Sequence, residues 1–127
     1  MKTIILFRHG KSDWNAHFED DHDRPINKRG TNAAKKMGKH LSDRKEIPQL
    51  LISSTALRAR ETIELAAQSG NWNSECIFEP RIYGGSPNVL IEIIKNINEK
   101  FNSVCLIGHE PNFSSFISRS CNEKHHR

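Results

Sequence analysis

The sequence predicts an α/β protein, a three-layer α/β/α sandwich with a mostly parallel sheet. Two observations support this fold class. Short apolar runs, the first of them dominated by β-branched residues, alternate four times with segments of helical apolar periodicity. Pro, Gly, Asn or Ser mark most of the changes between them. Because this alternation is typical of right-handed βαβ units, the carboxyl ends of all four strands should lie along one edge of the sheet.

The first half of the chain predicts two strands and two helices. Lys2–Phe7 is a continuous apolar run, the pattern of a strand covered on both faces, and Leu50–Ser53 is a shorter second strand. Between them, after a polar loop at 10–24, Pro25 and Asn27 open a helix. Its predicted apolar face is Ala33, Ala34, Met37 and Leu41. The next helix should end at Gly70, and its predicted stripe is Ala56, Ala59, Ile63, Ala66 and Ala67.

The second half predicts the same alternation. Glu75–Glu79 is a weaker third strand, and Ser86-Pro87 starts a helix, since proline at the first helical position loses no hydrogen bond. The apolar face of that helix is Leu90, Ile93, Ile94, Ile97 and Phe101. Ser103–Ile107 is the fourth strand. Pro111 begins a last helix that carries Phe113, Phe116 and Ile117. We expect one domain over residues 1–117 and a polar tail over 118–127.

Composition narrows the class of protein. No run approaches the ~20 apolar residues of a membrane helix, and the run before Arg8 is too short for a signal peptide. We therefore expect a cytoplasmic protein without a membrane partner. Cys105 lies in an apolar run and is expected in the core. The net charge is +4, but no nucleic-acid signature accompanies the lysines, so a solvated face that favours anionic ligands is expected rather than a nucleic-acid partner.

Polar residues gather where the predicted strands end. The first strand runs into Arg8 and His9, and the fourth into Gly108 and His109. The second ends in Ser53-Ser54, with Arg58 in the first turn of the helix beyond. Ligands of open α/β sheets bind outside the carboxyl ends of the strands. Two histidines and two arginines from distant parts of the sequence are therefore predicted to meet in one anion site.

These side chains suit phosphoryl transfer. That reaction needs a nucleophile, an in-line leaving group and positive charge around the equatorial oxygens. A guanidinium presents a planar fork of donors that matches phosphate. A neutral imidazole is nucleophilic near pH 7, and the phosphoimidazole that it forms is reactive enough for water to attack next.

Four segments resemble the histidine phosphatase (phosphoglycerate mutase-like) superfamily. Arg8-His9-Gly10 resembles its R-H-G signature, and Arg58-Ala59 with Thr62 resembles its second motif. Gly108–Pro111 is similar to its last motif, and Arg24–Gly30 fits the segment that leads into its first helix. The resemblance spans residues 2 to about 115. The small size and the R-P-x-N-K-R-G motif look most like the SixA-type phosphohistidine phosphatases.

The resemblance implies a role for each matching residue. His9 is the nucleophile that becomes phosphohistidine. Arg8 and Arg58 clamp the phosphate oxygens, His109 donates to the same phosphoryl group, and Arg24 adds a further phosphate contact. The family needs no metal or other cofactor. The implied partner is a phosphorylated protein or a small phosphomonoester, and nothing in the sequence predicts the oligomeric state.

Two departures from the family pattern stand out. Larger members supply a catalytic acid after the third strand, whereas here Pro80 and Arg81 occupy the candidate positions and Glu79 is the nearest carboxylate. Glu79 is either a displaced acid or a salt-bridged surface carboxylate. SixA-type members are thought to manage without the acid, which favours phosphohistidine substrates. Family members also usually continue into further strands beyond the last motif, so whether C-terminal edge strands complete this sheet stays open.

Simpler interpretations of single residues also stay open. Arg58 could be a helix-surface arginine, for which Arg60 is the internal control, and His109 could cap the last helix. The run 17–23 (H-F-E-D-D-H-D) is read as a solvated acidic loop rather than a metal site, because adjacent residues rarely converge on one ion. Three functions remain: a protein phosphohistidine phosphatase, a phosphatase for small phosphomonoesters, and a non-catalytic phosphate-binding module.

Overall fold

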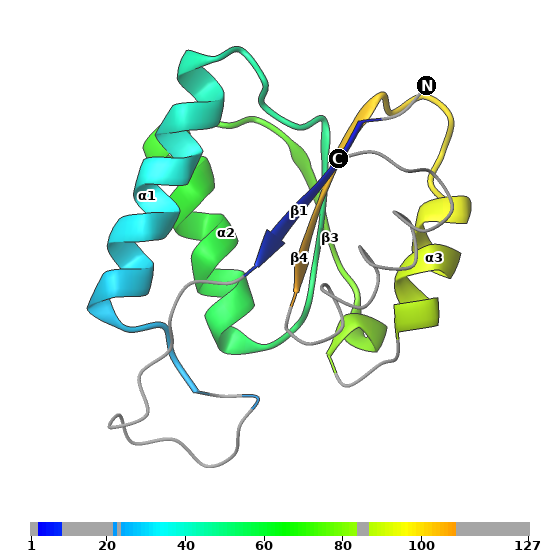
Figure 1. The fold of residues 1–127 in the computed structure, drawn as a ribbon, viewed down its shortest axis with the longest axis horizontal. Helices are drawn as coiled ribbons and strands as arrows, with labels where there is room; N and C mark the ends of the chain where they lie inside the picture. Colours follow the sequence, from blue (N-terminus) through cyan, green and yellow to red (C-terminus); the bar gives the residue numbers. More distant parts are fainter. Residues whose placement is uncertain (1–2, 9–21, 23, 84–86, 109–127) are drawn as a thin grey trace, which may run out of the picture.

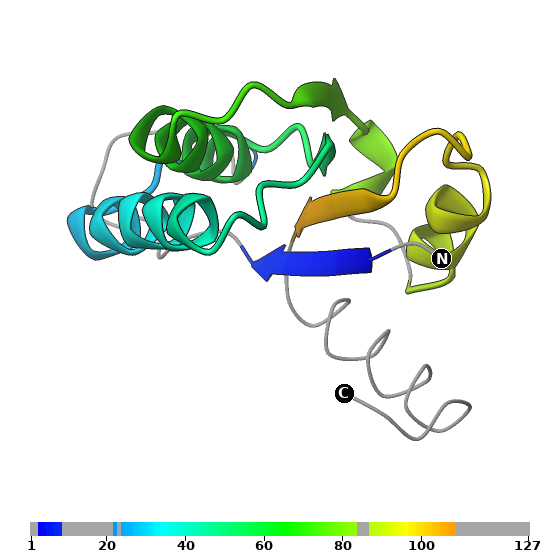
Figure 2. The same ribbon diagram turned by 90° about the horizontal axis from the view of Figure 1, so that it is seen from above.

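A four-stranded parallel sheet lies between two helical layers in the computed structural model, which describes residues 3–8, 22, 24–83 and 87–108 (Figure 1). The strand order is β1-β4-β2-β3. The strands are β1 (Thr3–Arg8), β2 (Leu50–Ser53), β3 (Glu75–Phe78) and β4 (Ser103–Gly108). Helices α1 (Lys28–Asp43) and α2 (Leu57–Gly70) cover one face, and α3 (Pro87–Lys95) covers the other (Figure 2). The predicted sandwich and its parallel sheet are confirmed.

Alternate residues of the strands enter two separate cores. On β4, Val104 and Leu106 pack in the core under α3, whereas Cys105 and Ile107 pack in the core under α1 and α2, and all four are fully buried. β1 divides in the same way, with Ile4 and Leu6 on one side and Ile5 and Phe7 on the other. The continuous apolar runs in the sequence therefore reflect a sheet that is covered on both faces.

The first helix begins as predicted but buries a different face. Asn27 is its N-cap, and its side-chain oxygen accepts from the Gly30 amide at 2.8 Å. The buried positions are Gly30, Ala34, Gly38 and Leu41. The predicted face was wrong at Ala33 and Met37, which are exposed, Met37 to 41%. The reason is that α1 contacts α2 through its glycines, and this rotates the contact stripe by about one residue.

Helices α1 and α2 approach each other closely at two glycines. A Cβ added to Gly38 would overlap the carbonyl oxygen of Ala66, and one added to Gly70 would overlap that of Gly38. The indole of Trp72 then donates to Gly38 O at 3.0 Å. Gly70 is the last residue of α2, as predicted, and it packs on α1. Asn71 takes the left-handed conformation (φ 58°).

The third strand is the least covered part of the sheet. All four residues of β3 are exposed, including Ile77 (44%) and Phe78 (45%), and β3 stands at one end of the strand order. Its weak signal in the sequence agrees with that position. The helix predicted from Pro111 and the tail predicted for 118–127 lie outside the described residues.

Candidate active site

Three strands end side by side at one edge of the sheet. Arg8 of β1 is the register partner of Gly108 of β4, and Ser53 of β2 is the partner of Ile107. The Ser54 amide then donates to Ile107 O at 2.9 Å, which extends the alignment by one residue. Neighbouring strands lie about 4.8 Å apart. The next residues in the sequence are His9 and His109, and these two residues and the side chain of Arg8 lie outside the described part of the structure.

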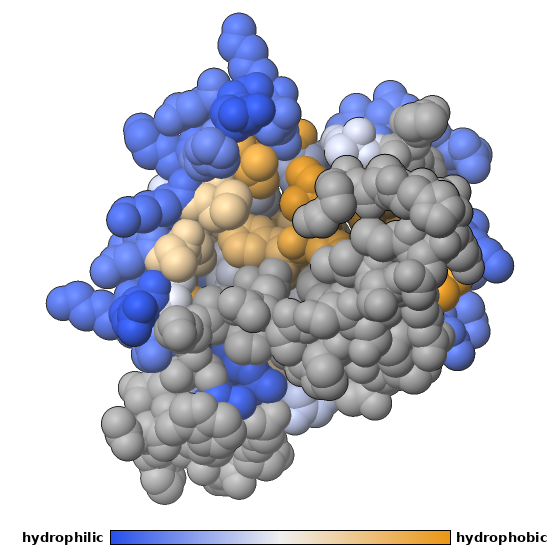
Figure 3. Space-filling model, viewed as in Figure 1, coloured by the Kyte–Doolittle hydropathy of each residue, from blue (hydrophilic) through white to orange (hydrophobic). Residues whose placement is uncertain are grey.

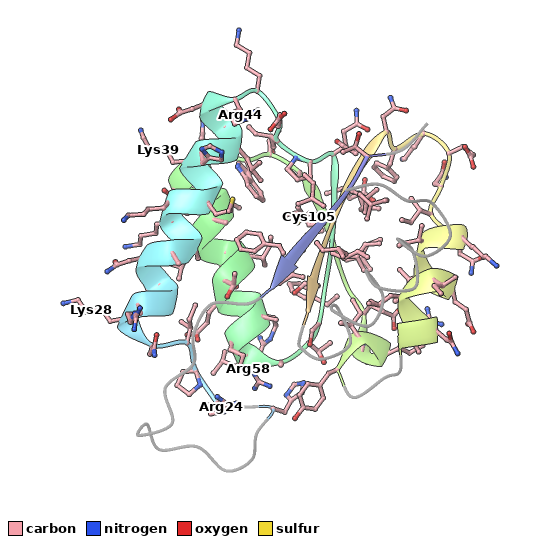
Figure 4. The ribbon with its side chains drawn as sticks, in the orientation of Figure 1. Arg24, Lys28, Lys39, Arg44, Arg58 and Cys105 are labelled. Atoms are coloured by element: carbon pink, nitrogen blue, oxygen red, sulfur yellow. The ribbon has the colours of Figure 1, made fainter. Side chains whose placement is uncertain are left out.

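Two of the predicted arginines are buried at this same edge. Arg58 is only 5% exposed and Arg24 only 6%. Figure 4 shows both at the end of the molecule where the α2 helix starts. Arg60, the internal control, is half-buried and donates from Nε to Thr55 O at 2.9 Å. Since burying a guanidinium is costly unless polar groups surround it, Arg58 is not an ordinary helix-surface arginine.

Buried side-chain hydroxyl groups lie around the start of α2. Ser53, Ser54 and Thr62 are fully buried. Ser54 Oγ accepts from the Ala56 amide at 3.1 Å, and Thr62 Oγ1 donates to Arg58 O at 2.7 Å. The N-cap residue, Ala56, makes no side-chain cap bond to the helix. The first turn of a helix with such an N-terminus favours an anion, because its N–H groups point outward and the helix dipole is positive there.

Three residues that the sequence did not predict for the site are linked to Arg58 by a series of contacts. The guanidinium carbon of Arg58 lies over the ring of Tyr83, 5.8 Å from its centroid. The ring of His22 meets the ring of Tyr83 edge-on, with centroids 4.9 Å apart, and its Nε2 shares a 2.9 Å hydrogen bond with Thr55 Oγ1. One signal was available for Thr55, because it directly follows the predicted strand end. For His22 no such signal was present, because its acidic neighbours favoured the interpretation of residues 17–23 as a solvated loop.

Glu79 is engaged elsewhere. Its carboxylate forms hydrogen bonds with the Arg81 side chain at 3.0 and 3.1 Å and with the Arg81 amide at 3.1 Å. The side-chain hydrogen bond from Arg81 lowers the pKa of Glu79 below its usual value, with the Arg81 amide and charge acting in the same direction. Glu79 and Arg81 also line a groove of about 360 Å³ between β3 and the end of α3, which neither Arg24 nor Arg58 lines. Glu79 is therefore a carboxylate salt-bridged to Arg81 in this structure.

The outer side of α1 carries the positive charge that the composition suggested. Lys28, Lys35, Lys36 and Lys39 are exposed, and Figure 3 shows hydrophilic residues along this side of the molecule. Within the described ranges, no three His, Cys, Asp or Glu residues are grouped so that they could hold a metal ion. No helix in that part of the chain is long and apolar enough to cross a membrane.

Comparisons with known proteins give the same family as the motifs. Residues 4–83 match the model of the histidine phosphatase superfamily, branch 1. An uncharacterised chloroplast protein of Arabidopsis thaliana is 32% identical over 126 residues, which cover 92% of this chain and 58% of that protein. The chain thus spans less than two thirds of the length of that relative.

Solved structures extend the likeness to the whole fold. SixA from Agrobacterium tumefaciens superposes with a TM-score of 0.88 at 29% identity, over 98% of this chain and 80% of that one. The protein histidine phosphatase SixA in complex with tungstate shares the fold, with a TM-score of 0.79 at 24% identity over 91% of this chain and 74% of that one. With the family model covering most of the described strands and helices, this chain belongs to the histidine phosphatase superfamily.

Proposed function

We propose that this protein is a phosphatase that forms a covalent phosphohistidine on His9 and removes phosphate from phosphohistidine on a protein. The observation that carries the proposal is the pair of buried guanidinium groups, Arg24 and Arg58, at the sheet edge where Arg8 and Gly108 end neighbouring strands. His9 and His109 follow those two strand ends directly in the sequence. One anion site between them would have both its nucleophile and its positive charge.

The proposed reaction has two displacements at phosphorus. A ring nitrogen of His9 attacks the substrate phosphorus, the P–N bond of the substrate breaks, and the leaving imidazole takes a proton. Water then attacks the phosphorus of phospho-His9, the new P–N bond breaks, and inorganic phosphate leaves with the imidazole of His9 restored. Arg8, Arg58 and Arg24 would stabilise the equatorial oxygens, and His109 would donate to the same phosphoryl group.

The state of Glu79 supports a phosphohistidine substrate. An alkoxide leaving group needs an acid, and a carboxylate whose pKa is held low by Arg81 is a poor proton donor near pH 7. A protonated imidazole is a better leaving group than an alkoxide, so its departure depends less on a catalytic acid. The likeness to the protein histidine phosphatase SixA agrees with this substrate class. The proposed unit is residues 1–117, and its chemistry requires no metal or other cofactor.

The test is to trap and locate the phosphoryl group. After incubation with a radiolabelled phosphohistidine peptide and rapid denaturation at alkaline pH, we expect acid-labile label on His9 and none in His9→Ala. The matched control is His40→Ala, since His40 is an exposed histidine in the last turn of α1. Binding of phosphate without any phosphoenzyme would instead support the non-catalytic module.

Substrate class is tested by comparing turnover. We expect kcat/KM for a phosphohistidine peptide to exceed that for p-nitrophenyl phosphate and for sugar phosphates. Faster hydrolysis of the esters would favour the small-molecule phosphatase. EDTA should leave all these rates unchanged, whereas strong inhibition would point to a metal ion.

A further inference from the structure

We propose that His22 is a positioning residue, which fixes the plane of the Arg58 guanidinium through the ring of Tyr83. This inference rests on the proposed function, because it treats Arg58 as a phosphate ligand. It assigns a task to a histidine that lies in the acidic segment before the first helix.

Three contacts link four side chains in series, from Thr55 through His22 and Tyr83 to Arg58. Thr55 shares a hydrogen bond with His22, His22 meets Tyr83 edge-on, and Tyr83 lies under Arg58. Thr55 and Arg58 are only three residues apart, at the turn between β2 and α2. The series of contacts therefore starts and finishes on one short segment of backbone. His22 and Tyr83 each contact two members of the series, so neither can move without disturbing two others.

The chemistry of the Arg58–Tyr83 contact explains how this series of contacts could orient Arg58. A guanidinium that lies over an aromatic ring is attracted through its face and retains the N–H donors in its plane. The Tyr83 contact therefore orients Arg58 without using the donors that a phosphate would take. Because Arg58 is only 5% exposed, it has little freedom to search for a phosphate, and its plane must be correct beforehand.

The residues in this series of contacts come from three separate parts of the chain. His22 precedes α1, Thr55 follows β2, and Tyr83 follows the 3₁₀ turn Pro80–Ile82 after β3. The backbone carbonyl of Thr55 also accepts a hydrogen bond from Arg60 Nε. His22 is thus tied to Thr55 at the start of α2, which holds Arg58, and to Tyr83.

Tyr83 offers a direct readout, since it is the only tyrosine in the chain. Incorporation of 3-fluorotyrosine places one fluorine label on the aromatic ring of Tyr83. The ¹⁹F NMR resonance of this label reports the surroundings of the Tyr83 side chain. In the wild-type protein we expect the resonance to shift when inorganic phosphate is added, because Arg58 lies over Tyr83 and is the proposed phosphate ligand.

The decisive variant is Thr55→Val, which removes the hydroxyl and keeps the shape. We expect the ¹⁹F resonance to move in the free protein, the dissociation constant for inorganic phosphate to rise about tenfold, and kcat/KM to fall about tenfold, an effect typical of a slightly misplaced ligand. Thr55→Ser should restore these values. Ser69→Ala removes a hydroxyl at the far end of α2, where Ser69 donates to Lys35 O, and should leave all three measurements unchanged.

A second variant guards against a folding defect. His22→Asn removes the ring that contacts Tyr83 without changing α2, and we expect the same direction of change. Wild-type phosphate affinity and kcat/KM in both Thr55→Val and His22→Asn would overturn this inference and leave the proposed function intact. A wild-type protein that shows no phosphate response and no turnover would overturn the proposed function itself.

Discussion

Arg8 and Gly108 are register partners in two neighbouring parallel strands, although a hundred residues separate them in the sequence. Each is followed directly by a histidine. Parallel pairing aligns the residues of adjacent strands at the same height along the sheet, so the first positions beyond a shared pair start from neighbouring points. The proposed nucleophile and its proposed helper thus depend on one strand register.

His109→Ala should lower kcat by about 10²-fold, the size of effect that a lost proton donor or transition-state donor has. His9 would still accept the phosphoryl group, so the phosphoenzyme should form slowly and remain detectable. Single-turnover kinetics with a labelled phosphohistidine peptide measures both steps. Complete loss of labelling would mean that His109 is needed for phosphate binding itself.

Arg58→Ala should lower kcat/KM by 10²–10³-fold, as expected when a donor to the transition state is removed. Arg60→Ala should change it less than about threefold, because Arg60 donates to a backbone carbonyl and is half-buried rather than enclosed. Steady-state kinetics on one substrate compares the two. Equal losses would show that the wrong arginine has been assigned to phosphate.

Glu79→Gln should leave the rate within about fivefold of the wild type, since the Glu79 carboxylate is bound to Arg81 and its lowered pKa makes it a poor acid. The variant should affect the pH dependence of unfolding instead. A carboxyl with a folded-state pKa below its unfolded value stabilises the fold above the unfolded pKa, and this contribution is lost as the pH falls through the folded value.

The measurement for Glu79 is urea unfolding of the wild type and Glu79→Gln between pH 7 and pH 2.5. We expect the wild type to be the more stable near neutrality, with the difference shrinking in the acid range. A large loss of kcat in Glu79→Gln at unchanged KM would revive the displaced acid.

Gly38→Ala should destabilise the protein although alanine is the better helix former. The added Cβ would overlap the backbone of Ala66, and a clash with backbone in a packed interface costs about 1–3 kcal/mol, more than the ~1 kcal/mol that alanine contributes in a helix interior. Ala33→Gly at an exposed position of the same helix should cost about 1 kcal/mol from propensity alone. Denaturant unfolding measures both, and a more stable Gly38→Ala would show that the helices can separate without cost.

Much of this fold could be predicted from the sequence because both faces of the sheet are covered. That coverage makes the strands continuously apolar, so Leu50–Ser53 was predicted with its observed bounds. The face of α1 was predicted less well, since periodicity rewards large apolar residues such as Met37 and ignores the glycine at 38. A close helix crossing depends on the absence of a side chain, and hydrophobic patterns carry no signal for that.

The same contrast between local patterns and contacts in space applies to the candidate site. A strand end and a family motif mark the positions of Arg58 and Arg24, and both are buried at the sheet edge, while their contact with phosphate stays a prediction. The contacts of His22 with Thr55 and Tyr83 could not be predicted, since they join three segments that no local pattern connects. Such contacts depend on how the loops are placed in space, and a single sequence does not contain that distance information.

The position of β4 between β1 and β2 has a consequence for biosynthesis. The ribosome synthesises Arg8 a hundred residues before its register partner Gly108, and β1 has its described sheet partner only in Ser103–Gly108. Helices α1 and α2 can pair with each other well before that point. β1, which the proposed nucleophile follows in the sequence, therefore lacks this partner until Ser103–Gly108 has been made, and we expect phosphoryl chemistry only after that point.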